Sequence, residues 1–330
     1  MAPRYRFLFL MDPYPTLNLE TETSLLLMNE LLDRGLAVFW LEASDVYLRG
    51  NRVFGRVASV TRAHPLRRDA AADRPLEDFH ALLVRKDPPF DQGYLQLTLL
   101  LDYLPVSLMQ FNAAAALRNF NEKLLPLRWP ALSPPTLVSG SSREITAFLD
   151  RHQRIVLKPL HDCSGRGIEF VSRDEQAGSR IERYLSEHAA TSPFVIAQRF
   201  LPEVADGDKR VYLVAGEPVG WVNRLPAADR FLANIHQGGR CEATGLTAFE
   251  RRAVASVAPF LVEHGIFLAG LDFIGDHLTE INITSPSAIR QINQVMNTRL
   301  EAKLVDAMLG VLASRNRPEQ EGPTDLPGPT

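Results

Sequence analysis

The chain has 330 residues, of which 45% are hydrophobic and 23% charged, proportions typical of a globular protein and not of a disordered or fibrous one. Lys and Arg total 36 against 39 Asp and Glu, so no basic surplus indicates binding to nucleic acid or to an anionic membrane. A chain of this length is expected to form two or three domains. We also expect it to be cytoplasmic, because two cysteines give no disulfide framework and no apolar run approaches the ~20 residues that span a bilayer.

The first part of the chain is typical of a parallel sheet with connecting helices. Short apolar runs at 5–11, 37–41 and 81–84 predict buried strands, and the spacing of leucines at 23–34 predicts a helix. The segment 61–75 is rich in arginine and has weak periodicity. We interpret it as a solvent-exposed excursion without chemistry.

A cluster of prolines between 126 and 135 follows a predicted helix at 113–125 and indicates a linker between domains. A small α/β unit comes next. Its predicted strands lie at 155–158, 168–171 and 194–200, and its predicted helix at 179–188.

The C-terminal part predicts a hairpin and two helices. The alternating runs 211–214 and 219–222 flank Gly216-Glu217, a turn signal. Helices are predicted at 247–264 and 297–313. The tail from Ser314 is rich in proline and glycine, and we expect it to be disordered.

The segment 270–282 is the most informative part of the chain, because it predicts a hairpin that brings oxygen ligands together. With a three-residue loop at 275–277, Asp272 lies across from Glu280, and Asn282 shares that face. Carboxylate and amide oxygens without His or Cys suit Mg²⁺, which takes its other ligands from water and substrate phosphates. The alternative is a solvated acidic strand face, against which the apolar flanks of both strands count.

A Mg²⁺ site of this kind implies phosphates, and two lysines are candidates to bind them. Lys158 ends an apolar strand, where an ammonium is costly to bury without an anion, and Lys123 lies at the end of a predicted helix. Each is as well explained as a surface lysine. The turn 164–167 could cover phosphates with backbone N–H groups, although it matches neither the P-loop nor the dinucleotide fingerprint. A nucleotide held by a different fold is implied.

A series of short motifs runs along the chain up to about Leu312. They are Met11-Asp12-Pro13, Asp45-Val46-Tyr47-Leu48, Arg85-Lys86-Asp87-Pro88-Pro89-Phe90, Asn121-Glu122-Lys123-Leu124, Leu157-Lys158-Pro159-Leu160, Asp206-Gly207-Asp208-Lys209-Arg210-Val211, Gly216-Glu217-Pro218 and Thr279-Glu280-Ile281-Asn282 with Thr284-Ser285-Pro286. In order and spacing they resemble the ATP-grasp ligases, and among them the prokaryotic glutathione synthetases. Agreement at so many points is not a chance result.

The resemblance implies an α/β (α+β) ATP-grasp fold with a parallel-sheet N-terminal domain that precedes the ATP-grasp part. We expect an N-terminal domain at 1–122, a small ATP-grasp subdomain at 123–200, a catalytic subdomain at 201–313 and the tail at 314–330. The implied reaction is ATP-dependent ligation of γ-glutamylcysteine to glycine with release of ADP and phosphate. The resemblance also implies a homotetramer.

The resemblance carries over to particular residues. One or two Mg²⁺, or Mn²⁺, would be held by Asp272, Glu280 and Asn282, and Arg210 and Asn234 would act on the reacting phosphoryl group. ATP would be bound by Lys123, Lys158, Ser164, Gly165, Gly167, the hinge residues Gln198, Arg199, Phe200 and Leu201, and Asp208 at the ribose. The peptide side would be lined by Arg85, Lys86, Asp87, Gly238, Gly239, Ser285 and Arg290, under a mobile lid at 227–240.

Two segments depart from the family pattern. The family's loop Asp-Gly-Met-Gly-Gly is replaced by 161–167, with Cys163 and Arg166, and a lid arginine is replaced by Leu232. His236 is newly polar in the same lid and could touch a different acceptor, or could simply face solvent. Both segments would cover the substrates, so two alternatives stay open. They are a related ATP-grasp peptide ligase with another donor or amine, and a non-catalytic ATP-binding paralogue.

Overall fold

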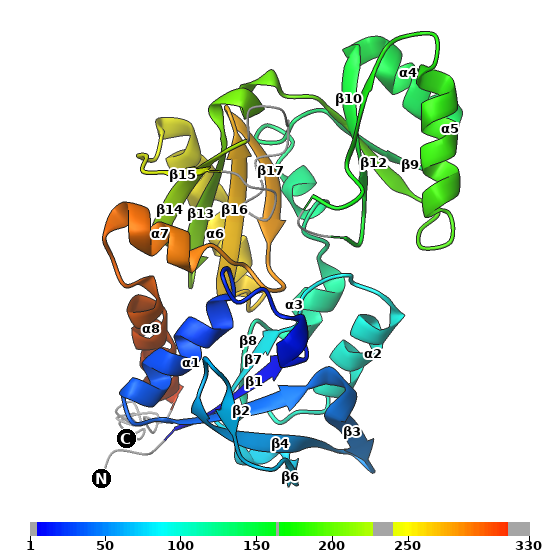
Figure 1. Ribbon diagram of the computed structural model, residues 1–330. Coiled ribbons are helices and arrows are strands. Elements are labelled where there is room, and N and C mark those ends of the chain that lie inside the picture. The colour runs from blue at the N-terminus through cyan, green and yellow to red at the C-terminus, as the bar shows by residue number, and fades with distance from the viewer. Residues whose placement is uncertain (1–4, 163–164, 227–239, 316–330) are drawn as a thin grey trace, which may run out of the picture.

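The computed structural model describes residues 5–162, 165–226 and 240–315. Three sheets organise this part of the chain, with the N-terminal sheet at one end and the small sheet, whose strands lie between residues 136 and 199, at the other (Figure 1). The third sheet, whose strands lie between residues 208 and 282, is placed between them. None of the helices in the described ranges has the length and apolarity that crossing a membrane requires.

The N-terminal sheet has the order β3-β4-β2-β1-β7-β8. Its parallel strands confirm the expected layer, and they are β1 (Arg6–Met11), β2 (Ala37–Glu42), β7 (Ala81–Arg85) and β8 (Met109–Phe111). The helices α1 (Thr23–Asp33) and α8 (Leu300–Arg315) belong to the core on one face. The helices α2 (Gln92–Leu101) and α3 (Ala114–Asn119) belong to the core on the other face.

The segment 61–75 is mostly exposed, as expected, but it contains short strands and is not an irregular excursion. The long strand β4 (Arg52–Arg62) pairs antiparallel with β2 and β3 (Val46–Arg49), and the short strands β5 (Arg67–Arg68) and β6 (Ala72–Pro75) pair with β4. The arginines hide this pattern because Arg52, Arg56 and Arg62 are exposed on one face of β4, whereas Val53 and Val57 are buried on the other.

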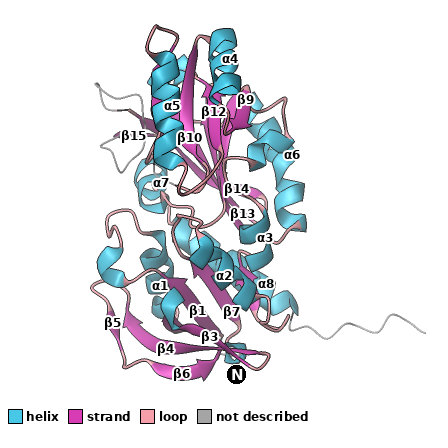
Figure 2. Ribbon diagram, turned by 90° about the vertical axis from the view of Figure 1, so that its right-hand side faces the viewer, coloured by secondary structure: helices cyan, strands magenta, loops and turns pink. Residues whose placement is uncertain are grey.

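The small sheet is antiparallel, with the order β11-β10-β12-β9. Its strands are β9 (Thr136–Ser139), β10 (Arg154–Pro159), β11 (Glu169–Ser172) and β12 (Val195–Arg199). The helices α4 (Ser142–His152) and α5 (Ala177–His188) cover one face and share its core (Figure 2). No helix of this unit covers the other face, and side chains of β10 and β12 on it line the cavity described below.

The third sheet has the order β15-β14-β13-β16-β17, and all its neighbours are antiparallel. Its strands are β13 (Asp208–Val214), β14 (Glu217–Leu225), β15 (Arg240–Glu242), β16 (Leu268–Ile274) and β17 (His277–Asn282). The expected β13–β14 hairpin is confirmed, with Ala215 and Gly216 at positive φ in its turn.

Helices cover both faces of this third sheet. The helix α6 (Ala248–Glu263) begins with a capping box between Thr247 and Glu250. The helix α7 (Ile289–Met296) packs on β14 at Gly220, where a Cβ would approach Cγ2 of Ile292 to 2.6 Å. Only glycine permits this close approach.

Candidate active site

A cavity of about 690 Å³ lies where the three sheets meet. Its walls come from the loop after β1, the end of β7, strands β10 and β12 of the small sheet, and strands β13, β16 and β17 of the third sheet. Because each wall belongs to a different sheet, a change in the angle between sheets changes the shape of the cavity.

The hairpin β16–β17 carries the three predicted metal ligands, and we call it the metal-ligand hairpin. Asp272 pairs with Glu280, as expected. The expected three-residue loop is wrong, because Ile274 pairs with His277 and only two residues form the turn. A bulge at Thr279 restores the register, and the Thr279 hydroxyl donates to the Asp272 carbonyl at 3.1 Å.

Asp272 is the most strongly paired carboxylate of the cavity. Arg210 on β13 donates to its two oxygens at 2.8 and 2.6 Å, and Arg224 on β14 lies 3.1 Å from Oδ2. Asn282 donates to the same Oδ2 at 3.1 Å. Burial alone would raise the pKa of Asp272, but the two guanidinium groups outweigh it and lower that pKa to about 2.

Arg224 also pairs with Asp208 at 2.7 Å. Burial raises the pKa of Asp208, with Arg224 acting in the opposite direction. Its Oδ1 is buried and has no hydrogen-bond partner within the described ranges. An acceptor of this kind, on the cavity wall, suits a ligand that brings a hydroxyl donor.

The metal-ligand hairpin fits a divalent cation by the chemistry of its donors. All three side chains offer oxygen, and the amide of Asn282 turns its nitrogen toward Asp272, which leaves Oδ1 as an acceptor. Oδ1 of Asp272 receives one hydrogen bond, so a lone pair remains. No group of three or more His, Cys, Asp and Glu suits a metal in the described part, because this set has two carboxylates and an amide.

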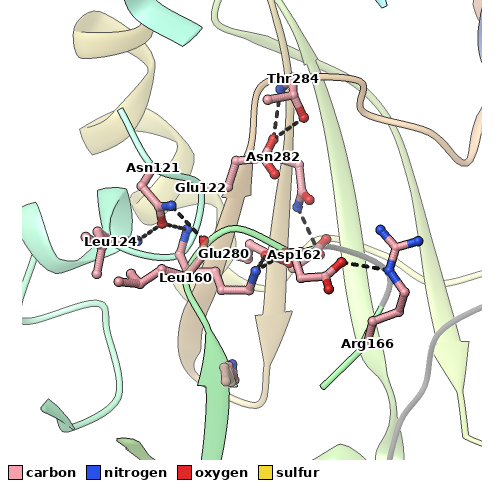
Figure 3. Close-up of polar contacts among 12 residues, drawn as sticks. Asn121, Glu122, Leu124, Leu160, Asp162, Arg166, Glu280, Asn282 and Thr284 are labelled. Atoms are coloured by element: carbon pink, nitrogen blue, oxygen red, sulfur yellow. Dashed lines mark hydrogen bonds and ion pairs between the residues drawn. The ribbon is translucent and has the colours of Figure 1, made fainter. Parts of the chain in front are cut away.

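The two predicted lysines both reach the cavity. Lys158 on β10 is partly buried, lines the cavity and donates to Gln198 Oε1 at 2.8 Å. Burial lowers its pKa, and Glu280 opposes this effect. Lys123 lies 3.9 Å from Glu280 Oε1 and donates to the Asp162 carbonyl (Figure 3). Burial raises the pKa of Glu280, and Lys123 opposes it.

Glu122, next to Lys123, holds the chain that follows β17 and was not predicted. Its Oε1 accepts from the backbone N–H groups of Ile283 and Thr284 at 2.6 and 2.8 Å, and from the Thr284 hydroxyl at 2.8 Å (Figure 3). The Glu122 carbonyl accepts from Ile281 at 3.0 Å. A glutamate inside a polar motif gives no sequence signal for such a role.

The N-terminal wall of the cavity carries charged groups of both signs. Arg85 donates to Ser24 Oγ at 2.9 Å and to the Pro286 carbonyl at 3.0 Å. Lys86 pairs with Asp12 at 3.2 Å. Burial and the charge of Glu22 raise the pKa of Asp87 to about 6, against the opposing effects of Arg85 and of a hydrogen bond with Ser285.

Most of the predicted site residues line this cavity, and they are Arg85, Lys86, Asp87, Lys123, Lys158, Gly165, Gln198, Arg199, Phe200, Leu201, Asp208, Arg210, Asp272, Glu280, Asn282 and Ser285. Gly167 and Arg290 are not among its lining residues. Gly167 instead accepts a hydrogen bond from the Tyr184 hydroxyl at 2.6 Å, and Arg290 lies on α7. Arg224, Glu22 and Asp12 line the cavity but were not predicted.

Other predicted residues lie outside the described residues. They are Ser164, Asn234, Gly238 and Gly239, together with Cys163, Leu232, His236 and most of the expected lid. Arg166, the other departure from the family loop, is described and lines the cavity. Its Nε donates to Asp162 Oδ1 at 2.7 Å, and its Nη2 donates to the Pro88 carbonyl at 3.4 Å.

The chain is similar to known proteins over most of its length. Residues 5–118 match the N-terminal domain of prokaryotic glutathione synthetase, and residues 122–297 match its ATP-grasp domain. The chain is 36% identical to a glutathione synthetase from Pseudomonas aeruginosa, over 92% of this chain and 98% of that protein. It is 37% identical to one from Yersinia pestis, over 92% and 97% of the two chains.

Solved structures share the fold at low identity. D-cycloserine synthetase DcsG has a TM-score of 0.65 at 15% identity, over 93% of this chain and 99% of that one. D-alanyl-alanine synthetase A from Vibrio cholerae has a TM-score of 0.61 at 16% identity, over 94% and 100%. Because the models of both domains of this family match the sequence, and its relatives are similar over most of their length, the chain belongs to the prokaryotic glutathione synthetase family of ATP-grasp ligases.

Proposed function

We propose that this chain joins γ-glutamylcysteine to glycine at the expense of ATP, with release of ADP and phosphate. The observation that supports the proposal best is that Lys123 and Lys158 share one cavity with the metal-ligand hairpin. Phosphoryl transfer needs cations that hold phosphates and oxygen ligands that hold Mg²⁺. Membership of the family gives the substrates.

In this proposal the nucleotide occupies the part of the cavity between the small sheet and the third sheet. Lys123 and Lys158 hold phosphates, the backbone of the hinge segment 198–201 receives adenine, and the buried Oδ1 of Asp208 accepts from a ribose hydroxyl. Gly165 offers a backbone N–H beside the phosphates. The Lys158–Gln198 hydrogen bond joins the phosphate side to the hinge.

The donor peptide occupies the N-terminal wall in this proposal. Arg85 and Lys86 supply positive charge for a carboxylate, and Asp87 supplies a partner for an ammonium group. Arg210, fixed in orientation by its two hydrogen bonds to Asp272, lines the same cavity as this wall and the metal-ligand hairpin. Its guanidinium therefore neutralises charge on the transferred group.

The chemistry follows from the weakness of a carboxylate as an electrophile. Transfer of the γ-phosphoryl group to the peptide carboxylate gives an acylphosphate, and attack by the amine then expels phosphate. A bound Mg²⁺ supplies Lewis-acid neutralisation of the phosphate charge. Lys123, Lys158 and Arg210 hold the phosphate oxygens, and the three surrounding sheets restrict water, which would hydrolyse the acylphosphate.

The number of metal ions and the state of assembly belong to the proposal. We expect one or two Mg²⁺ at Asp272, Glu280 and Asn282, with Mn²⁺ as a substitute because it accepts the same oxygen ligands. We expect a homotetramer, which native mass spectrometry would detect as a mass of four chains. Apolar residues exposed after α2, Tyr103 and Val106, offer surface for such contacts.

The proposal is tested by phosphate release from ATP and Mg²⁺ in the presence of γ-glutamylcysteine and a panel of amines that includes glycine. We expect glycine-dependent release, with glutathione identified by mass spectrometry. Turnover only with another donor or amine would assign the chain to a related peptide ligation. Absence of turnover with every pair would indicate a non-catalytic nucleotide-binding protein.

A further inference from the structure

One side-chain hydrogen bond connects the hinge segment 198–201 to the metal-ligand hairpin. Arg199, the last residue of β12, places Nη2 3.0 Å from Nε2 of His277, the first residue of β17. Figure 1 shows the hairpin β16–β17 running up toward the segment that joins β12 to β13. The bond therefore spans two of the three sheets that enclose the cavity.

A second contact beside this bond brings the same two segments together. Gly275, in the turn of the hairpin, lies so close to Glu203 in the 3₁₀ turn Pro202–Asp206 that a Cβ would stand 3.1 Å from Cβ and Cγ of Glu203. Gly275 also has a φ of +52°, a conformation that glycine adopts at low cost. The hairpin turn is thus packed against the 3₁₀ turn that directly follows the hinge, and Arg199–His277 is a polar contact beside this packing.

The chemistry of the two side chains fixes which way this hydrogen bond runs. A guanidinium has five N–H donors, no acceptor, and stays protonated in proteins. It must donate, so Nε2 of His277 must carry the lone pair and the ring proton must lie on Nδ1. Nδ1 of His277 and Nε of Arg199 are buried without a hydrogen-bond partner among the described residues, so neither side chain has a competing bond there.

The bond exists only while His277 is neutral. A proton on Nε2 would face the N–H groups of Arg199 and would place two cations in contact. Burial and Arg199 lower the pKa of His277, and Glu203 and Asp276 raise it. The imidazole is therefore neutral near pH 7 and becomes charged as the pH falls.

We propose that Arg199 and His277 are positioning residues, which form a latch that holds the hinge segment against the metal-ligand hairpin and keeps the nucleotide site closed. Arg199, Phe200, Leu201 and Ile274 line the cavity on either side of the latch, so its opening separates the adenine wall from the strands that carry Asp272 and Glu280. Nucleotide affinity then falls when the latch is broken or when His277 is protonated. The inference rests on the proposed function, because it takes the cavity to bind a nucleotide.

The test measures the dissociation constant of ADP with Mg²⁺ by calorimetry on the full chain between pH ~5.5 and ~8. Three variants are compared with the wild type. His277→Gln keeps an acceptor near the position of Nε2 that does not titrate, His277→Phe removes the acceptor, and His64→Gln is the matched control. His64 is exposed in the turn between β4 and β5, where its Nδ1 lies 2.8 Å from the Tyr14 hydroxyl.

We expect His277→Phe to weaken ADP binding about tenfold near pH 7, the value of one hydrogen bond to a charged group. His277→Gln restores the affinity. As the pH falls, the wild type and His64→Gln lose affinity relative to His277→Gln. The comparison with His277→Gln matters because the terminal phosphate of ADP itself titrates near pH ~6, an effect that is common to all variants.

The ring ¹⁵N shifts of His277 give a second measurement on the wild type, which does not depend on any variant folding. A proton on Nδ1 at neutral pH is expected, and a proton on Nε2 would overturn the latch. An identical pH dependence in the wild type and His277→Gln would also overturn it, as would wild-type affinity in His277→Phe. If the wild type does not bind ADP at any pH, the proposed function is contradicted instead. In that case the ring tautomer of His277 shows whether Arg199 donates to Nε2.

Discussion

Asp272 is a buried carboxylate that is kept ionised by neighbouring positive charges. It is 3% exposed, yet it stays ionised because Arg210 and Arg224 surround it. The same carboxylate is a proposed metal ligand, so it balances two guanidinium groups and contributes an oxygen to the cation. The sequence predicted Asp272 and Arg210 but not Arg224, because an arginine inside an alternating strand such as β14 is indistinguishable from a solvent-facing one.

We expect Asp272→Asn to lower the free energy of unfolding by about 3 kcal/mol at pH 7, because removal of one partner leaves buried guanidinium groups without their counter-charge. The native pKa of Asp272 is lowered to about 2, so this stabilisation is complete above the ordinary aspartate value and is lost as the pH falls from ~4 toward ~2. Urea unfolding at several pH values measures it. Asp276→Asn, in the exposed turn of the same hairpin, is the control and should change little.

Lys158 should limit activity on the alkaline side. Burial lowers its pKa, so the ammonium that holds phosphate loses its proton at a lower pH than an ordinary lysine would. We expect kcat/KM for ATP to fall on the alkaline side below pH ~10.4, the usual lysine value. Lys158→Arg, which stays charged, should move that fall to higher pH, and Lys158→Ala should abolish ATP turnover. An alkaline limb unchanged in Lys158→Arg would contradict the assignment.

At the scale of elements, the metal-ligand hairpin was predicted with the right partners and the wrong turn. Alternation along two apolar strands is enough to place Asp272, Glu280 and Asn282 on one face. The number of residues in the turn depends on the bulge at Thr279, and a bulge has no composition signal at a threonine. The sequence also did not predict helix α7. Its position depends on the close approach of Ile292 to Gly220 in a distant strand, which only the folded structure reveals.

Glu122 connects two segments that are distant in sequence, because its carboxylate accepts hydrogen bonds from the chain that follows β17. We call this contact the Glu122 clamp. We expect Glu122→Ala to lower the free energy of unfolding by about 3 kcal/mol, because two buried backbone N–H groups and the Thr284 hydroxyl lose their acceptor. Glu122→Gln, which keeps an acceptor oxygen without the charge, should lose less. Urea denaturation measures both.

Glu182→Ala is the matched control for that experiment. Glu182 is exposed on α5, and its removal should change stability by less than ~0.5 kcal/mol. Equal effects of Glu122→Ala and Glu182→Ala would contradict the role of the clamp.

At the scale of the whole molecule, apolar runs and their spacing were sufficient for the parallel N-terminal layer, most of the small sheet and the β13–β14 hairpin. The resemblance of short motifs supplied the fold, which periodicity alone could not. The boundaries at 122, 200 and 313 stay a prediction. What no pattern could supply is the meeting of the three sheets at one cavity, because that depends on contacts such as Glu122 with Thr284 and Arg199 with His277.

The central claim is that the peptide carboxylate attacks ATP before the amine attacks the peptide. It is tested by turnover of γ-glutamylcysteine labelled with ¹⁸O in the cysteinyl carboxylate, followed by mass spectrometry of the phosphate and of the product. The account predicts one ¹⁸O in each phosphate released, because the oxygen that bonds to phosphorus leaves with it when the amine attacks. Glutathione formed with unlabelled phosphate, so that the departing ¹⁸O appears in water, would contradict an acylphosphate and with it the function assigned to the cavity.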